Sequence, residues 1–280
     1  MPPWLIPAVF AAVVAIAITM SIEHFGGKRG GLLGSLPSTI VPAAIGLAAA
    51  SSSVGDFQDA LRITPAGMLI NALFLLSWRE LPPYIPPWRS EFRLLTCTIA
   101  SLLLWLAMAS FSVWLFPAAK SIGIGSAGLS LFLFISSVVL GIMACVKNPP
   151  APKGKAQVGI FAIMSRGLLA GVAIGISIWL ASHAGPFVAG VAAVFPAMFL
   201  TAMVTLWMAH GEHVGAGAVG PMMLGGTSVS AFALIASWSI PTLGTYWGSA
   251  LAWCLAVMAI TVPAWAWLNH IGSIHRQNKA

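Results

Sequence analysis

Apolar runs of about twenty residues follow one another along this 280-residue chain, and they limit the folds open to it. A helix of that length crosses the roughly 30 Å of hydrocarbon in a lipid bilayer. Charged residues make up only 7% of the chain, whereas a soluble domain carries about a quarter. So few charges cannot cover a water-facing surface, and the sequence predicts an all-α, polytopic transmembrane helical bundle.

Nine apolar runs are long enough to be read as membrane spans. They cover approximately residues 5–22, 30–50, 60–78, 94–116, 126–146, a sixth run that ends at 182 and starts between 158 and 167, then 187–209, 214–238 and 243–268. Prolines lie inside several of them, and each removes a backbone hydrogen bond from a helix interior. We therefore expect spans 2, 3, 7 and 8 to contain broken portions.

One stretch of the chain occurs twice. The segment from His24 to Pro37 matches the segment from His183 to Pro196 without a gap, at an offset of 159 residues. In each copy an apolar run ends at the histidine, a segment rich in Gly and Ala follows, and the proline lies inside the next apolar run. The repetition predicts a duplicated membrane unit.

The repeat extends further and sets the domain organisation. Asn71 matches Ser230 at the same offset, so spans 1–4 correspond to spans 6–9. Because five crossings separate equivalent helices, the second copy enters from the opposite side, and the repeat is inverted, as in many secondary transporters. We expect a first four-helix repeat, a linker with span 5, a second inverted four-helix repeat and a tail, over residues 1–116, 117–155, 156–268 and 269–280.

Positive charge orients the predicted spans. Ten Lys and Arg residues fall in the loops after spans 1, 3 and 5 and in the C-terminal tail, whereas the other side holds Arg62 and Lys120. Cytoplasmic loops of membrane proteins carry the excess of Lys and Arg. We expect a multi-pass protein of the cell (inner) membrane with its N-terminus outside and its C-terminus in the cytoplasm.

The candidate binding residues are polar groups and prolines in the middle of spans. No carboxylate lies mid-span, which weighs against a proton relay built on a central Asp or Glu. Hydroxyls, amides and freed backbone carbonyls let transporters hold ions and small solutes without charged side chains, although the same residue types also pack membrane helices. The predicted substrate-binding set is Pro37, Ser38, Thr39, Asn71, Pro196, Thr201, Thr227 and Ser230.

Three residues near span ends are predicted to act in gating. They are Glu23, His24 and His183, with each histidine at its own face of the membrane. A histidine that simply contacts water or lipid headgroups is the alternative interpretation. The loop 210–213 carries His, Gly, Glu and His, which suit a divalent cation, but two histidines three residues apart in a loop assign no metal site.

The remaining features favour no catalytic role. Asp56 and Asp59 are interpreted as a solvated turn at a helix start. The chain has no Walker loop, no Rossmann fingerprint and neither an HExxH nor a GxSxG motif. We expect no enzyme activity, no cofactor and no nucleic-acid partner, because the basic residues lie in short loops between spans.

Short motifs of the second half carry a family resemblance. Val188-Ala189-Gly190, Phe195-Pro196, Gly211-Glu212 and Gly248-Ser249-Ala250 with Trp253 are similar to those of the GlpM-type small membrane proteins, which are four-span chains. The resemblance covers residues 166–265 best and residues 5–110 more faintly. It implies two such units fused through span 5, and it supplies no catalytic residues to transfer.

The sequence favours a secondary transporter or permease for a small solute or ion. It would work by alternating access between the two inverted repeats. The alternatives are a passive ion channel and an accessory or structural membrane protein of a lipid or envelope pathway. The expected partners are the lipid bilayer and the small solute or ion, and homo-oligomerisation is left open.

Overall fold

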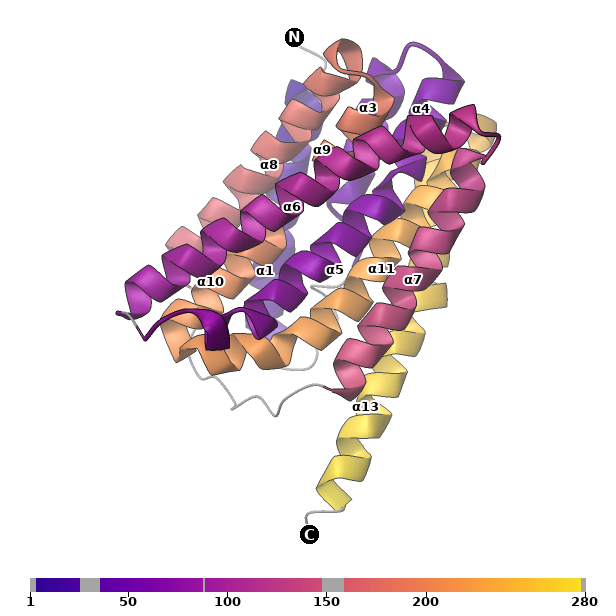
Figure 1. The fold of residues 1–280 in the computed structure, drawn as a ribbon. Helices are drawn as coiled ribbons and strands as arrows, with labels where there is room; N and C mark the ends of the chain where they lie inside the picture. Colours follow the sequence, from indigo (N-terminus) through magenta and orange to yellow (C-terminus); the bar gives the residue numbers. More distant parts are fainter. Residues whose placement is uncertain (1–3, 26–35, 88, 148–158, 278–280) are drawn as a thin grey trace.

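The computed structural model describes residues 4–25, 36–87, 89–147 and 159–277, and within these ranges it contains helices and no strand. Figure 1 shows the helices gathered into one bundle, with the chain ends at opposite ends of it. In chain order the elements are α1 (Leu5–Phe25), α3 (Ile40–Ala50), α4 (Val54–Arg62), α5 (Thr64–Glu80), the short turn η1 (Pro82–Tyr84), α6 (Ser90–Ser121), α7 (Ser126–Val146), α8 (Ile160–His183), α9 (Pro186–Ala192), α10 (Ala197–His210), α11 (Glu212–Leu243), α12 (Thr245–Ala256), the π-helical turn η2 (Val257–Thr261) and α13 (Val262–Gln277).

Seven stretches of helix are long and apolar enough to cross a membrane. They are Val54–Glu80, Ser90–Ser121, Ser126–Val146, Ile163–His183, Pro186–Met208, Ala216–Leu243 and Thr245–His270. Two shorter apolar segments, Leu5–Ala17 and Ile40–Ala50, cover parts of predicted spans 1 and 2, and residues 26–35 lie outside the described ranges. The all-helical fold is therefore confirmed, with seven membrane-length helices in the described part of the chain.

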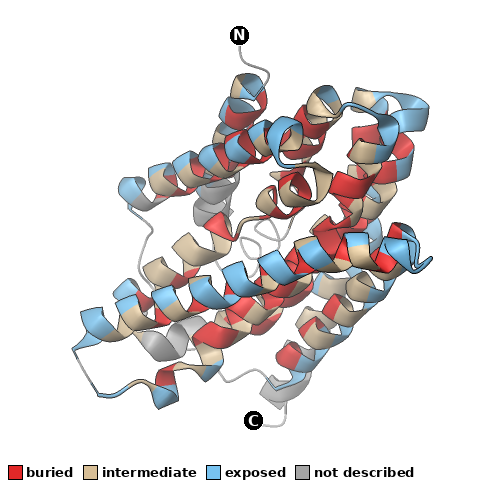
Figure 2. Cartoon of the chain, turned by 45° about the horizontal axis from the view of Figure 1, so that its top comes forward, coloured by how far each residue is buried: buried red, intermediate tan, exposed pale blue. Residues whose placement is uncertain are grey.

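The two long helices α5 and α11 pack against each other at the centre of the bundle. Helices α6 and α7 cover α5, while α7 and α12 cover α11. Figure 2 shows buried positions where helices face one another and exposed positions along the outer faces. Those outer faces are apolar, with side chains such as Leu103, Phe132 and Met258 exposed, as expected where lipid is the solvent.

Helices α1 and α8 form a closely packed antiparallel pair. Gly175, towards the end of α8, lies against Ala8 near the start of α1, whereas Gly167 near the start of α8 lies against Ile16. Small residues allow membrane helices to approach this closely. The last turn of α1, which contains His24, and the last residue of α8, His183, consequently lie at opposite ends of the pair.

Glycines with positive φ make the sharp turns of the second half. Gly185 (φ 87°) lies between α8 and α9, Gly211 (φ 79°) between α10 and α11, and Gly244 (φ 81°) between α11 and α12. Only glycine adopts this conformation without a steric cost. The chain can therefore reverse direction within a few residues at each place.

Prolines break some predicted spans and leave others intact. Predicted span 3 covers the end of α4 and most of α5, which meet at Ile63. Predicted span 7 is divided into α9 and α10. Helix α11 is continuous through Pro221, so the predicted break in span 8 is wrong. The backbone of α11 at Gly220 and Leu224, on either side of Pro221, lies directly against α7.

Candidate functional site

A turn inside the bundle, residues 193–196, separates α9 from α10. Val194 is 6% exposed and Pro196 is buried, so the interruption lies in the protein interior. The Ala197 N–H donates to the Phe195 carbonyl and the Leu200 N–H to the Pro196 carbonyl, each over 2.7 Å, and α10 starts again at once. The first N–H groups of a helix have no partner within it and carry partial positive charge. The break therefore presents polar backbone inside an apolar bundle.

Asn71 of α5 holds this break in place. Its Nδ2 donates to the Val194 carbonyl over 2.8 Å, and its Oδ1 accepts from Trp105 Nε1 over 2.8 Å. The Trp105 ring, from α6, meets the Phe195 ring edge to face, with centroids 5.2 Å apart. Asn71 is 2% exposed. One amide thus connects three elements, α5, α6 and the α9–α10 turn.

Two glycines let the backbone of neighbouring helices approach the break. A Cβ atom on Gly190 of α9 would overlap the Ala60 carbonyl oxygen of α4, and one on Gly67 of α5 would overlap a methyl group of Val194. Native packing leaves no room for either atom. The turn at 193–196 is therefore clamped on the α4–α5 side as well.

The matching stretch of the first half, residues 36–39, precedes α3. Pro37 is buried, while Ser38 and Thr39 are half-buried. The Ser38 N–H donates to the Leu36 carbonyl over 2.8 Å, and the Thr39 side chain makes no capping hydrogen bond to α3. Helix α3 therefore also begins in partly buried surroundings, three residues after a proline.

The other predicted binding residues differ in whether their hydroxyl groups have a hydrogen-bond partner. Thr201 and Thr227 donate to carbonyls one turn earlier in their own helices, over 2.9 and 2.7 Å. Ser230, which matches Asn71 in the repeat, is fully buried, and its hydroxyl has no hydrogen-bond partner among the described residues. The structure brings Asn71 and Pro196 into one buried group around the α9–α10 turn.

The predicted gating residues are only partly described. Glu23 and His24 lie in the last turn of α1, and their side chains are outside the described part. His183 is exposed at the end of α8, where its ring stacks on Trp179 with centroids 4.3 Å apart. Its Nδ1 lies 2.8 Å from the Trp179 carbonyl and 2.9 Å from the Ser182 hydroxyl. His183 thus contacts its own helix.

No metal site is found in the described part of the chain, where no three His, Cys, Asp or Glu side chains gather. The side chains of His210, Glu212 and His213 fall outside that part. The histidine motif of this loop is therefore untested, and the described residues offer no other candidate metal site.

The interpretation of Asp59 as part of a solvated turn is wrong. Asp59 is 8% exposed, and its carboxylate accepts from Lys120 Nζ over 2.9 Å and from the Ser126 hydroxyl over 3.0 Å. Arg62 Nη1 lies 3.5 Å from the same hydroxyl. Lys120 follows Asp59 by 61 residues, so no local pattern in the sequence indicates the pair. Asp56, by contrast, pairs with Ser53 at the start of α4.

Trp105 is the residue of the site that sequence reasoning missed. A buried tryptophan usually finds a partner for its indole N–H, and Trp105 lies in the middle of predicted span 4 while Asn71 lies in the middle of span 3. Helices that follow one another along a chain are commonly neighbours in space. These two signals together could have predicted the Trp105–Asn71 hydrogen bond.

Two hollows open on the described surface, and neither is lined by a predicted binding residue. One lies between α1 and α8, and it includes Trp4, Gly171 and Trp179. The other lies between α5 and α7 beside Leu69 and Ile135. Neither of these two hollows reaches the predicted binding residues.

The fold places the protein among the helical membrane proteins. It is all-helical in its described ranges, and its seven apolar helices of membrane-crossing length support a multi-pass membrane protein. Comparisons with family models, with curated proteins and with solved structures find no match for the chain.

Proposed function

We propose that the protein is a secondary transporter or permease for a small solute or ion. The observation that carries the proposal is the helix break at 193–196, which is buried in the bundle and fixed by Asn71 and Trp105. Transporters of this kind build their binding sites from interrupted helices whose backbone groups face the midplane.

The inverted repeat is the second part of the proposal. Equivalent helices of an inverted repeat run antiparallel, and α1 and α8 do so. The equivalent helices α5 and α11 pack against each other at the centre. In this proposal α1 and α3 complete a set of nine spans, with the N-terminus outside and the C-terminus in the cytoplasm of the cell membrane. Two fused GlpM-type units would have this arrangement.

The proposed mechanism is a rocking of one repeat against the other. The proposed site is formed by the starts of α3 and α10, which Pro37 and Pro196 precede and where no side chain caps the helix. Ser38, Thr39, Thr201, Thr227 and Ser230 supply hydroxyls around it. Glu23 with His24 at one face and His183 at the other would act as the gates.

An accessory or structural role is the second candidate. It is favoured by the satisfied state of the predicted ligands, since Asn71, Thr201 and Thr227 all bond to the protein itself. In that case the break would be a packing feature and the bundle would serve another membrane protein. A passive channel is the third outcome that an experiment must separate.

Flux through reconstituted vesicles tests the proposal. The purified chain is placed in proteoliposomes and given a panel of small radiolabelled solutes and ions, with the Pro37→Ala/Pro196→Ala variant as the comparison. Saturable uptake and counterflow that the double variant loses while it still folds would support a transporter. Large unitary currents would show a channel, and a double variant with normal uptake would remove the site assignment. No flux and no current, with a co-purifying partner, would favour the accessory role.

A further inference from the structure

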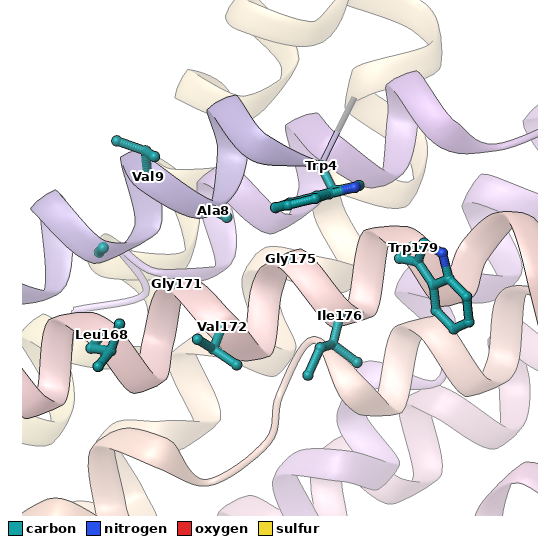
Figure 3. Close-up of a pocket in the computed structure, with 10 residues that line it drawn as sticks. Trp4, Ala8, Val9, Leu168, Gly171, Val172, Gly175, Ile176 and Trp179 are labelled. Carbon is teal, nitrogen blue, oxygen red and sulfur yellow. The ribbon is translucent and has the colours of Figure 1, made fainter. Parts of the chain in front are cut away.

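A groove lies between α1 and α8 on the outer, apolar surface of the bundle. It has a volume of about 530 Å³, and its lining is almost wholly apolar. Its floor consists of small residues, Ala8 and Ala12 from α1 and Gly171 and Gly175 from α8. Figure 3 shows the larger side chains of α8, from Leu168 onwards, standing along its edge. The groove exists because both helices carry small residues at the same level.

The length of the groove corresponds to one leaflet. Its lining residues on α8 run from Leu168 to Trp179, a rise of about 17 Å at ~1.5 Å per residue. Half of the hydrocarbon core is roughly 15 Å. Beyond Leu168 the same stripe of α8 continues with the large exposed side chains of Met164 and Phe161, outside the lining of the groove. The groove therefore has about the length of the acyl-chain region of one leaflet.

Aromatic and polar groups mark one end of the groove. Trp4 and Trp179 lie there from opposite helices (Figure 3), and tryptophan prefers the boundary between hydrocarbon and headgroups. His183 stacks on Trp179, and Ser182 lies beside it, both exposed. The order from end to end is thus polar groups, aromatic rings and then an apolar channel, which is the order of headgroup and acyl chain in a phospholipid.

We propose that this groove binds one acyl chain of a membrane phospholipid, from the leaflet on the side of His183. The chain would lie over Gly171 and Gly175, with the headgroup at the level of Trp4, Trp179 and His183. Because one wall comes from α1 and the other from α8, a bound lipid contacts both halves of the chain. The proposal does not depend on the transport function.

A helix from a second copy fits the groove less well. Helix pairs in membranes associate through small residues that let the backbones approach closely. The small residues that helix pairs use are already engaged, since Gly171 packs against the Ala8 carbonyl and the Ala12 methyl group. An acyl chain needs only an apolar channel of one leaflet's depth.

Photolabelling with a lipid tests the proposal. The full chain is reconstituted in phosphatidylglycerol and phosphatidylethanolamine vesicles that contain phosphatidylcholine with a diazirine in mid-chain, and the labelled positions are found by mass spectrometry. We expect residues 4–12 and 168–179 to be labelled severalfold more than the exposed face of α7 around Phe132. Equal labelling of the two surfaces would overturn the proposal.

Two variants fill the groove by different routes. Gly175→Leu adds a side chain whose Cβ has ordinary contacts, 3.4 Å to the Ala8 methyl group and 3.5 Å to Trp4. Val172→Trp fills it from the exposed side and does not disturb the core. Both should reduce groove labelling to the level of α7. The control is Gly128→Leu, because Gly128 of α7 faces open space, and it should label as the unaltered chain does.

Two results would refute the lipid assignment. Undiminished labelling in both folded variants would place the bound chain elsewhere. A disulfide-linked dimer of Val172→Cys, made together with Cys254→Ser to remove the exposed native thiol, would show that a second copy occupies the groove. Helix content from circular dichroism confirms that each variant has folded.

Discussion

Removing the Asn71 side chain should destabilise the bundle much more than removing its counterpart in the repeat. Asn71→Ala deletes two hydrogen bonds of 2.8 Å, one to the Val194 carbonyl and one from Trp105 Nε1. Both partner atoms stay in the interior, because Val194 is 6% and Trp105 7% exposed. Ser230→Ala deletes a hydroxyl with no hydrogen-bond partner among the described residues.

The magnitude follows from the membrane setting. Hydrogen bonds between membrane helices average ~0.6 kcal/mol, with a maximum of ~1.7 kcal/mol. Two lost bonds therefore lower the free energy of unfolding by about 1–3 kcal/mol, at the lower end of the cost that applies to unsatisfied buried groups. Ser230→Ala should leave the free energy of unfolding unchanged or raise it, because a buried polar group without a partner is removed.

Unfolding in mixed micelles of detergent and SDS, followed by circular dichroism, measures both variants. Trp105→Phe completes a double-mutant cycle, since it keeps the ring against Phe195 and removes only the indole N–H. We expect a coupling energy of about 0.6–1.7 kcal/mol between positions 71 and 105. Equal stabilities for Asn71→Ala and Ser230→Ala, or a coupling energy of zero, would refute the idea that Asn71 holds the break.

Two further predictions use the same unfolding assay. Gly190→Ala should lower the free energy of unfolding by about 1–3 kcal/mol through overpacking against Ala60, while Gly128→Ala, in open space, should cost nothing; equal stability of the two would contradict the close contact. Asp59→Ala should cost about 1.5–3 kcal/mol because two hydrogen bonds to a charged group are lost. Lys120→Ala should lower the free energy of unfolding by at most ~1 kcal/mol, since the lysine is 61% exposed. A larger loss for Lys120→Ala than for Asp59→Ala would contradict the view that the buried carboxylate contributes more to stability than the lysine does.

Helix type and position were largely predictable from the sequence because apolar runs and membrane helices have the same length. Predicted span 5 coincides with α7, and both are residues 126–146. The ends were harder to predict where prolines lie. Helix α6 continues through Pro117 to Ser121, past the predicted end at 116, because a proline near a helix end does not prevent the helix from continuing when neighbours satisfy the freed carbonyl.

The position of the site along the chain could be predicted from the sequence, but the contacts around it could not. Pro196 marked the break because a proline in an apolar run between glycines and alanines disrupts a helix. The partners of the break come from helices distant in sequence, since 123 residues separate Asn71 from Val194. Pairing over such distances depends on how helices pack, which periodicity in one helix does not reveal. The same reason hid the Asp59–Lys120 pair.

Access of water to the buried break tests the central claim most directly. Thr201→Cys and Ser38→Cys, in a chain whose three native cysteines are replaced, are treated with a membrane-impermeant thiol reagent from each side of sealed vesicles. Val139→Cys, on the outer face of α7, is the lipid-facing control. The transporter account predicts that Thr201→Cys and Ser38→Cys react from both sides while Val139→Cys does not react. Failure of both positions to react from either side would contradict it, because the break would then be permanently packed.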